Sequence, residues 1–173
     1  MVFGYYHCLS RAQKAVYRRS DAVERIALPQ PGRYADLVLN LEQALDGEQR
    51  RRVEQAVTAL LDALVAGLSV PPLRCRVLSA RPADDWGELH GLYEPEEEGT
   101  RARLTVWMRT ARHKRVVAFR SFLRTILHEF CHHLDYELLQ LSDSLHTEGF
   151  FKRESSLFHQ LVRGEEPGER RER

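Results

Sequence analysis

The sequence contains no run of about 18 apolar residues, so it predicts no membrane-spanning helix. Its first residues also lack the basic start and apolar stretch of a signal peptide. Cysteine is scarce: Cys8, Cys75 and Cys131 are widely spaced and form no CxxC pair, which argues against a disulfide framework. Reduced thiols and the missing leader together favour a cytoplasmic protein.

Net charge is nearly absent as well. The chain of 173 residues carries 26 Lys and Arg against 25 Asp and Glu, a formal net charge of +1. A total this small argues against a strongly basic nucleic-acid-binding protein, but it conceals an uneven distribution. Eight Lys or Arg and no acid lie in residues 99–127, whereas seven acids and no Lys or Arg lie in residues 84–98. An electropositive surface is therefore not excluded by the total charge.

Hydrophobic periodicity divides the chain into helices, then strands, then helices. Apolar spacing predicts helices over residues 10–26, 34–45, 50–70, 118–134 and 146–162, the first beginning at a capping box of Ser10 and Gln13. A second capping box is predicted over residues 46–49. Strands are predicted over residues 73–79, 87–93 and 104–108, joined as an antiparallel hairpin or meander.

This order predicts an α+β fold. The length fits one domain over residues 1–163, with a helical N-terminal part (1–70) and a core (73–163) that carries the chemistry. Residues 164–173 have almost no apolar content and are expected to form a disordered tail.

The segment His128-Glu129-Phe130-Cys131-His132 fits the pattern His-Glu-x-x-His. On a helix, residues four positions apart lie on the same face, so the two imidazoles can bind one Zn²⁺ at about 2.0–2.1 Å each. Glu129 lies about 100° around the helix, which places its carboxylate beside the metal, where it can take a proton from a zinc-bound water. The apolar stripe of this helix centres nearly opposite the histidines, which favours a zinc site over a histidine pair in the core.

A catalytic zinc takes a third protein ligand and keeps its fourth position for water. His146 is the leading candidate, because it follows His132 by 14 residues and stands at the start of the last predicted helix. Glu154 and Glu148 are the alternatives, since either could supply the ligand from that following helix.

The motif, followed by His146 and by Phe150 four positions later, resembles the SprT-like group of minimal zinc metallopeptidases. The resemblance covers about residues 73–163 and implies a minimal zincin-like domain with a hairpin, a zinc helix and a short closing helix. It also implies proteolysis near DNA in some members. The chain departs from the group at Thr147, where glycine is usual, and no zinc ribbon with paired cysteines follows. A weaker likeness to glutamate-ligand metallopeptidases keeps Glu148 and Glu154 open.

Other residues of the motif helix have predicted roles. Asp135 lies seven residues after His128 and nearly on its face, where it can hold a ligand histidine, anchor the following loop, or simply be a polar residue of the last turn. His133 turns away from His128 and is not expected to bind metal, and Cys131 is expected in the core. Tyr136 or Tyr93 can polarise a substrate carbonyl, and the sequence does not distinguish them.

A peptide substrate of such an enzyme docks in extended form against an exposed strand edge. We expect this edge to be the strand nearest in sequence to the zinc helix, which contains Leu104, Thr105, Val106 and Trp107. For Trp107 packing is the favoured role, because large aromatic side chains dominate core burial.

The basic residues that follow this strand can contact phosphates; they are Arg109, Arg112, Lys114 and Arg115. The favoured interpretation is nevertheless a solvated basic loop that the acidic residues of 84–98 neutralise.

We therefore predict a zinc-dependent metallopeptidase in which Glu129 acts as general base and acid. Its partner is a peptide or protein substrate, no membrane is expected, and the oligomeric state is left open. The alternative is a non-catalytic zinc module that binds nucleic acid or a protein partner through residues 101–124. A hydrolase of a non-peptide amide is a third candidate, because the zinc-water chemistry is the same.

Overall fold

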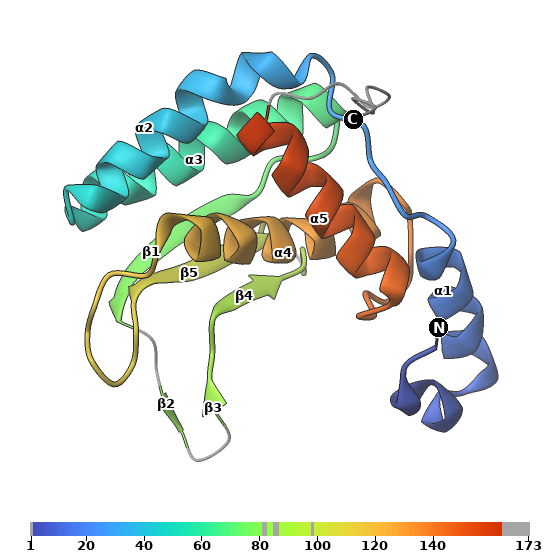
Figure 1. Cartoon of the computed structure of the whole chain (residues 1–173). Coiled ribbons are helices and arrows are strands. Elements are labelled where there is room, and N and C mark those ends of the chain that lie inside the picture. The colour runs from blue at the N-terminus through green and yellow to red at the C-terminus, as the bar shows by residue number, and fades with distance from the viewer. Residues whose placement is uncertain (1, 81–82, 85–86, 98, 164–173) are drawn as a thin grey trace, which may run out of the picture.

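Five α-helices and a small mixed sheet make up the described part of the chain, in a computed structural model (Figure 1) that describes residues 2–80, 83–84, 87–97 and 99–163. The helices are α1 (Arg11–Asp21), α2 (Ala35–Asp46), α3 (Arg50–Leu68), α4 (Phe119–Glu137) and α5 (Glu148–Arg163). The strands are β1 (Arg74–Ala80), β2 (Ala83–Asp84), β3 (Gly87–Glu88), β4 (Gly91–Glu94) and β5 (Arg103–Arg109). The predicted α+β class is confirmed, whereas the predicted tail, residues 164–173, lies outside the described residues.

Helix α1 begins at its predicted capping box. The backbone N–H of Gln13 donates to Ser10 Oγ (3.2 Å), and the N–H of Ser10 donates back to Gln13 Oε1 (3.1 Å). The apolar spacing predicted that this helix ends near Ile26, but it ends at Asp21. Residues 23–28 form neither helix nor strand, and Ile26 joins the core from this segment, 7% exposed.

The second predicted capping box is wrong. Asp46 is the last residue of α2, so its side chain is not placed to cap the next helix, and the N-cap of α3 is Gln49, which makes no side-chain cap hydrogen bond. Glu48 takes a left-handed conformation (φ 54°) in the tight turn between the two helices. The turn itself, and not a capping side chain, separates α2 from α3.

The three-stranded sheet has the order β1-β5-β4, with β5 parallel to β1 and antiparallel to β4. The hairpin of β4 and β5 is confirmed, but the meander is wrong, because β4 lies on the far side of β5 from β1. The predicted strand over 87–93 is also divided, into β3, which pairs with β2 in a separate two-stranded sheet, and β4.

Strand β5 is the centre of this sheet and not its edge. Both of its edges are paired, and every residue from Leu104 to Met108 is buried, so the strand is covered on both faces. The prediction that Leu104, Thr105, Val106 and Trp107 form the exposed substrate edge is therefore wrong. Trp107 is a packing residue, 6% exposed, and β4 is the sheet edge on this side.

One hydrophobic core holds these elements together. It extends along the chain from Ile26 to Leu161 and so draws on both the N-terminal helices and the segment after residue 73. Helix α3 packs against β1, and α4 packs against β4 and β5. Cys131 is fully buried in this core, as predicted. Helix α5 crosses α4, and α1 lies beside the start of α5 (Figure 1).

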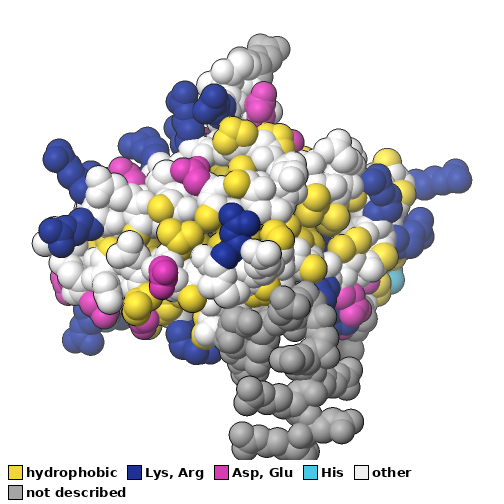
Figure 2. All heavy atoms as spheres, turned by 90° about the horizontal axis from the view of Figure 1, so that it is seen from above, with side chains coloured by type: hydrophobic (Ala, Val, Ile, Leu, Met, Phe, Trp, Pro, Cys, Tyr) yellow, Lys and Arg dark blue, Asp and Glu magenta, His cyan; other side chains and the backbone are white. Residues whose placement is uncertain are grey.

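The surface is mixed in character. On the face seen from above, Lys and Arg side chains project at several separate places among apolar and acidic ones (Figure 2). Among the described residues, no helix combines the length and hydropathy that a bilayer crossing demands.

Candidate metal centre

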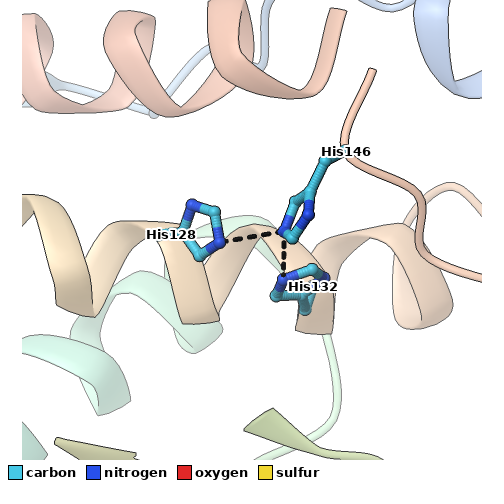
Figure 3. Close-up of side chains that lie close together, drawn as sticks. All are labelled: His128, His132 and His146. Carbon is cyan, nitrogen blue, oxygen red and sulfur yellow. Dashed lines mark hydrogen bonds between the residues drawn. The ribbon is translucent and has the colours of Figure 1, made fainter. Parts of the chain in front are cut away.

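Three histidine side chains converge at one point. His128 and His132 lie one turn apart on α4, and His146 reaches them from the loop that precedes α5 (Figure 3). Nε2 of His146 lies 3.0 Å from Nε2 of His128 and 3.1 Å from Nε2 of His132. Three nitrogens bound to one tetrahedral zinc would lie roughly 3.4 Å apart, so a small outward movement accommodates the ion. The spacing thus fits a metal of this size.

Hydrogen bonds on the far side of two rings determine which nitrogen faces the cluster. Ser144 Oγ donates its only proton to Asp135 Oδ2 (2.8 Å), so Nδ1 of His132, 2.7 Å away, must donate to Ser144 Oγ. Glu154 Oε2 accepts from Nδ1 of His128 at 3.1 Å. Both Nε2 atoms therefore present lone pairs to the same point, where they can accept from Nε2 of His146 or bind a cation.

Burial favours the neutral form of His132 and His146. Desolvation, followed by the neighbouring His128 and His146, lowers the pKa of His132 to about 3. Desolvation also lowers the pKa of His146, although that residue is the most exposed of the three. Neutral imidazole is the form that binds a metal ion.

Asp135 performs both of its predicted roles. It is fully buried, and through Ser144 it holds the ring of His132 and the loop that leads to His146. Its other oxygen forms an ion pair with Arg153 (2.6 Å), which is also fully buried. Arg153 donates in addition to the carbonyl oxygens of Ser20 and Val23, both at 2.6 Å. This network joins α4, α5 and the end of α1 beneath the histidine cluster.

The two glutamates predicted as alternative ligands lie elsewhere. Glu154 contacts Nδ1 of His128, on the side of the ring that faces away from the cluster, and its second oxygen lies 3.5 Å from Arg124. Glu148 is partly exposed and pairs with Lys152 at 3.2 Å. Within the described part of the chain, the donor group that could hold an ion here consists of the three histidines. The structure brings His146, and neither glutamate, to the point where the Nε2 atoms of the two motif histidines meet.

Glu129 lies beside the cluster and is 7% exposed as a residue. Burial raises its pKa to about 7, against the lowering effect of His128 and of a hydrogen bond from the Tyr93 backbone. The backbone of β4 passes very close to this side chain, since a Cβ on Gly91 would lie 2.5 Å from Glu129 Oε1. Glycine at position 91 therefore allows the carboxylate to sit between α4 and β4.

A cleft of about 590 Å³ opens over the cluster and over Glu129. Strand β4 and its flanks form one wall, α4 and the loop before α5 the other. The lining residues include Leu89, Leu92, Arg124, Thr125, Tyr136 and Ser144. The open cleft distinguishes this site from a closed structural zinc site with four protein ligands.

The two tyrosines considered as carbonyl-polarising groups differ in their contacts. His133 donates through Nε2 to the carbonyl oxygen of Pro71 (2.8 Å), so its Nδ1 accepts from the Tyr93 hydroxyl at 3.1 Å. Tyr93 is thus committed to His133, and it stacks on His132 and Tyr136. His133 is not part of the cluster, in agreement with the prediction. Both tyrosines line the cleft, and Tyr136 is the one whose hydroxyl is not bonded to His133.

The basic residues after β5 have separate positions. Arg109 donates to the carbonyl oxygen of Lys114 (2.9 Å) and pairs with Glu48, so it holds its own loop. Arg112, Lys114 and Arg115 are exposed in the loop between β5 and α4. Of the acids in 84–98, Glu94 binds Arg103 on β5 through two hydrogen bonds of 2.6 and 2.7 Å, whereas the acid that pairs with Arg109 is Glu48. Neutralisation of the loop by residues 84–98 stays a prediction.

The sequence did not predict the roles of several residues at the site. Ser144 stands only two positions before His146, but a serine in a loop carries no ligand signal. Arg153 has the right spacing for the buried face of α5, but arginine side chains are mostly exposed in proteins, so its burial is not predicted. Thr147, which replaces the glycine of the resembled family, caps α5 by accepting from the N–H of Phe150 (3.0 Å). Because threonine is favoured at N-cap positions, the sequence could have predicted that Thr147 caps α5.

Comparison with known family models, curated proteins and solved structures finds no match to this chain.

Proposed function

We propose that this protein is a zinc-dependent metallopeptidase with a minimal zincin-like domain. The observation that carries the proposal is the convergence of three histidine Nε2 atoms beside a buried glutamate, on the floor of an open cleft. Three nitrogen ligands and a free side for water are the arrangement of a catalytic zinc, and the neutral imidazoles suit zinc among the common divalent metals.

The division of labour follows from the geometry. A zinc ion, when bound by the three histidines, would polarise a substrate carbonyl and lower the pKa of a water molecule. Glu129 lies next to the cluster but not in it, so its carboxylate is free to take the proton from the attacking water and to return it to the leaving amine. Glu154 and Ser144 keep the rings of His128 and His132 oriented.

Strand β4 is the proposed docking edge for the peptide. It pairs with β5 on one side and lines the cleft on the other. Leu89 and Leu92, 43% and 39% exposed, lie along this wall and offer apolar contacts to alternate side chains of an extended peptide. The role first expected for β5 thus passes to the neighbouring strand.

The test uses Glu129→Gln, a substitution of nearly equal shape. The variant is expected to bind one zinc per chain, while hydrolysis of a quenched fluorescent peptide library falls by a factor of about 10² to 10⁴. Glu148→Gln is the matched control, because Glu148 pairs with Lys152 at the surface and is expected to retain full activity.

Two results would contradict the proposal. One is a parent protein that, after metal removal, takes up no zinc. The other is a zinc-loaded Glu129→Gln protein that cleaves as fast as the parent. Zinc uptake without cleavage of any peptide would favour the non-catalytic module or the hydrolase of a non-peptide amide.

A further inference from the structure

The N-terminal segment reaches the loop that carries His146. The hydroxyl of Tyr5 donates to the backbone carbonyl oxygen of His146 at 2.7 Å, a contact between residues 141 positions apart. The rings around this bond support it, since Tyr5 packs edge-on against Tyr17 of α1. His146 is the most exposed histidine of the cluster and is the only one of the three that does not lie on α4. It therefore depends on contacts of this kind for its position.

The end of α1 contacts the start of α5, immediately after His146. The N–H of Gly149 donates to Asp21 Oδ1 at 2.9 Å, so Asp21 satisfies one of the free donors in the first turn of α5. Ser20 Oγ lies 3.3 Å from the hydroxyl of Thr147, and both side chains are fully buried. A Cβ at Gly149 would overlap the backbone of Asp21, so α1 is seated directly on the backbone of α5.

The supports of the three ligands differ in kind. His128 and His132 belong to a helix whose other face is in the core, where Ile126, Phe130 and Leu134 are fully buried. The loop before α5 is held on the cluster side by Ser144 and on the outer side by Tyr5, Ser20 and Asp21. Without the outer contacts, the loop would keep the bonds of Ser144 and of the Leu141 N–H to Asp135, and His146 would keep its ring contacts with Phe150 and Phe151.

We infer that Tyr5, Ser20 and Asp21 are positioning residues of the metal centre, and that the N-terminal segment places the third ligand. The inference rests on the proposed metal site. Because coupling between two equilibria is reciprocal, metal binding also stabilises the docking of α1. The segment of residues 2–21 is thus a part of the site, although no atom of it belongs to the ligand group.

Metal affinity is the measurement that separates positioning from general stability. Tyr5→Phe removes one hydroxyl from a side chain that is 39% exposed, and zinc affinity, measured by competition with a chromophoric chelator, is expected to fall about 2- to 10-fold. Tyr6→Phe is the control, because the Tyr6 hydroxyl faces Arg18. Both variants are expected to unfold at the parent temperature in the metal-free state.

Asp21 gives a stronger change. Asp21→Ala is expected to weaken zinc binding about 3- to 30-fold, and Asp21→Asn, which keeps an acceptor oxygen, is expected to restore most of the loss. Asp36→Ala is the control, since Asp36 occupies the first turn of α2 and is exposed. Hydrogen exchange of the parent adds an independent measurement, in which zinc slows the amides of α1 as well as those of α4.

The outcomes are distinguishable from those for the proposed function. If the parent binds no zinc, both the function and this inference are wrong. If the parent binds zinc and Tyr5→Phe and Asp21→Ala bind it equally well, only the positioning role is overturned. The positioning role would also be overturned if zinc leaves the hydrogen-exchange rates of the α1 amides unchanged.

Discussion

At the scale of single residues, one serine hydroxyl determines the tautomer of His132 in the histidine cluster. Ser144 has a single proton and gives it to Asp135, so the ring of His132 must carry its own proton on Nδ1. The same logic applies to His128, whose Nδ1 faces the Glu154 carboxylate. Each ring therefore enters the cluster in the tautomer that leaves Nε2 free for a metal.

We predict that Ser144→Ala weakens zinc binding about 10- to 100-fold, the usual effect of losing a partner that orients a ligand. The imidazole of His132 would lose its acceptor, and Asp135 would lose its donor. Ser142→Ala, an exposed serine in the same loop, is expected to bind zinc like the parent. Equal affinities for the two variants, measured by chelator competition, would show that the Ser144 contact does not orient His132.

Gly91→Ala is predicted to damage catalysis without removing the metal. The added methyl group would meet three side-chain atoms of Glu129 at 2.5 to 2.8 Å, so the carboxylate must move away from the cluster. A misplacement of about 1 Å costs roughly 10²-fold in rate. The measurement is peptide hydrolysis together with zinc content, and Gly32→Ala, where a Cβ meets no atom within 4 Å, is the control. Unchanged hydrolysis by Gly91→Ala would mean that this contact does not hold Glu129.

At the scale of elements, a buried ion pair joins helices that are distant in sequence. Arg153 of α5 pairs with Asp135 of α4 and donates to two carbonyl oxygens at the end of α1. Its guanidinium thus supplies a partner for the carbonyl oxygen of Ser20, in the last turn of α1, and for that of Val23, just beyond the helix. Three helices meet at one side chain, which is linked to His132 of the histidine cluster through Asp135 and Ser144.

Arg153→Met is predicted to destabilise the metal-free protein by about 3–5 kcal/mol, because it leaves the Asp135 carboxylate buried without its partner. The double variant Arg153→Met with Asp135→Asn removes the unpaired charge and is expected to recover part of this loss. Urea denaturation of the metal-free proteins measures both. A cost below about 1 kcal/mol for the single variant would show that the pair does not anchor the three helices.

The elements also show what sequence alone could predict. Helix α4 and its ligand spacing follow from local periodicity, and the capping box of α1 from four adjacent residues. The order of the sheet does not follow from local pattern, because inserting β5 between β1 and β4 is decided by which faces α3 and α4 cover. Asp135 could be predicted from its seven-residue spacing to His128. The contact of Tyr5 with His146 and those of Arg153 with Ser20 and Val23 could not, since these partners lie more than 100 positions away.

At the scale of the whole molecule, the proposed ion would tie together parts that the hydrophobic core joins only indirectly. The main hydrophobic cluster begins at Ile26, and the segment before it, in which Val16 and Tyr17 are also buried, makes polar contacts to α5 and to the loop before it. A ligand that binds only the folded state stabilises the fold in proportion to the logarithm of its concentration over its Kd.

Zinc at about 100 times its Kd is predicted to raise the free energy of unfolding by about 2.7 kcal/mol. For a chain of this length, that corresponds to an increase in Tm of about 5–10 °C, and a chelator is expected to reverse it. His146→Ala should fold without metal but show a much smaller increase. A parent protein whose melting curve is unaffected by zinc and by chelator would contradict the metal site itself.

The long contact between Tyr5 and His146 has a consequence for the protein during its synthesis. A nascent chain that ends after α4 already contains His128, Glu129 and His132, but not the histidine that completes the cluster. The segment around Tyr5 is synthesised 141 residues before its partner His146, so this contact forms only after translation has reached the start of α5. Assembly of the cluster is thereby delayed until the fold that surrounds it has been made.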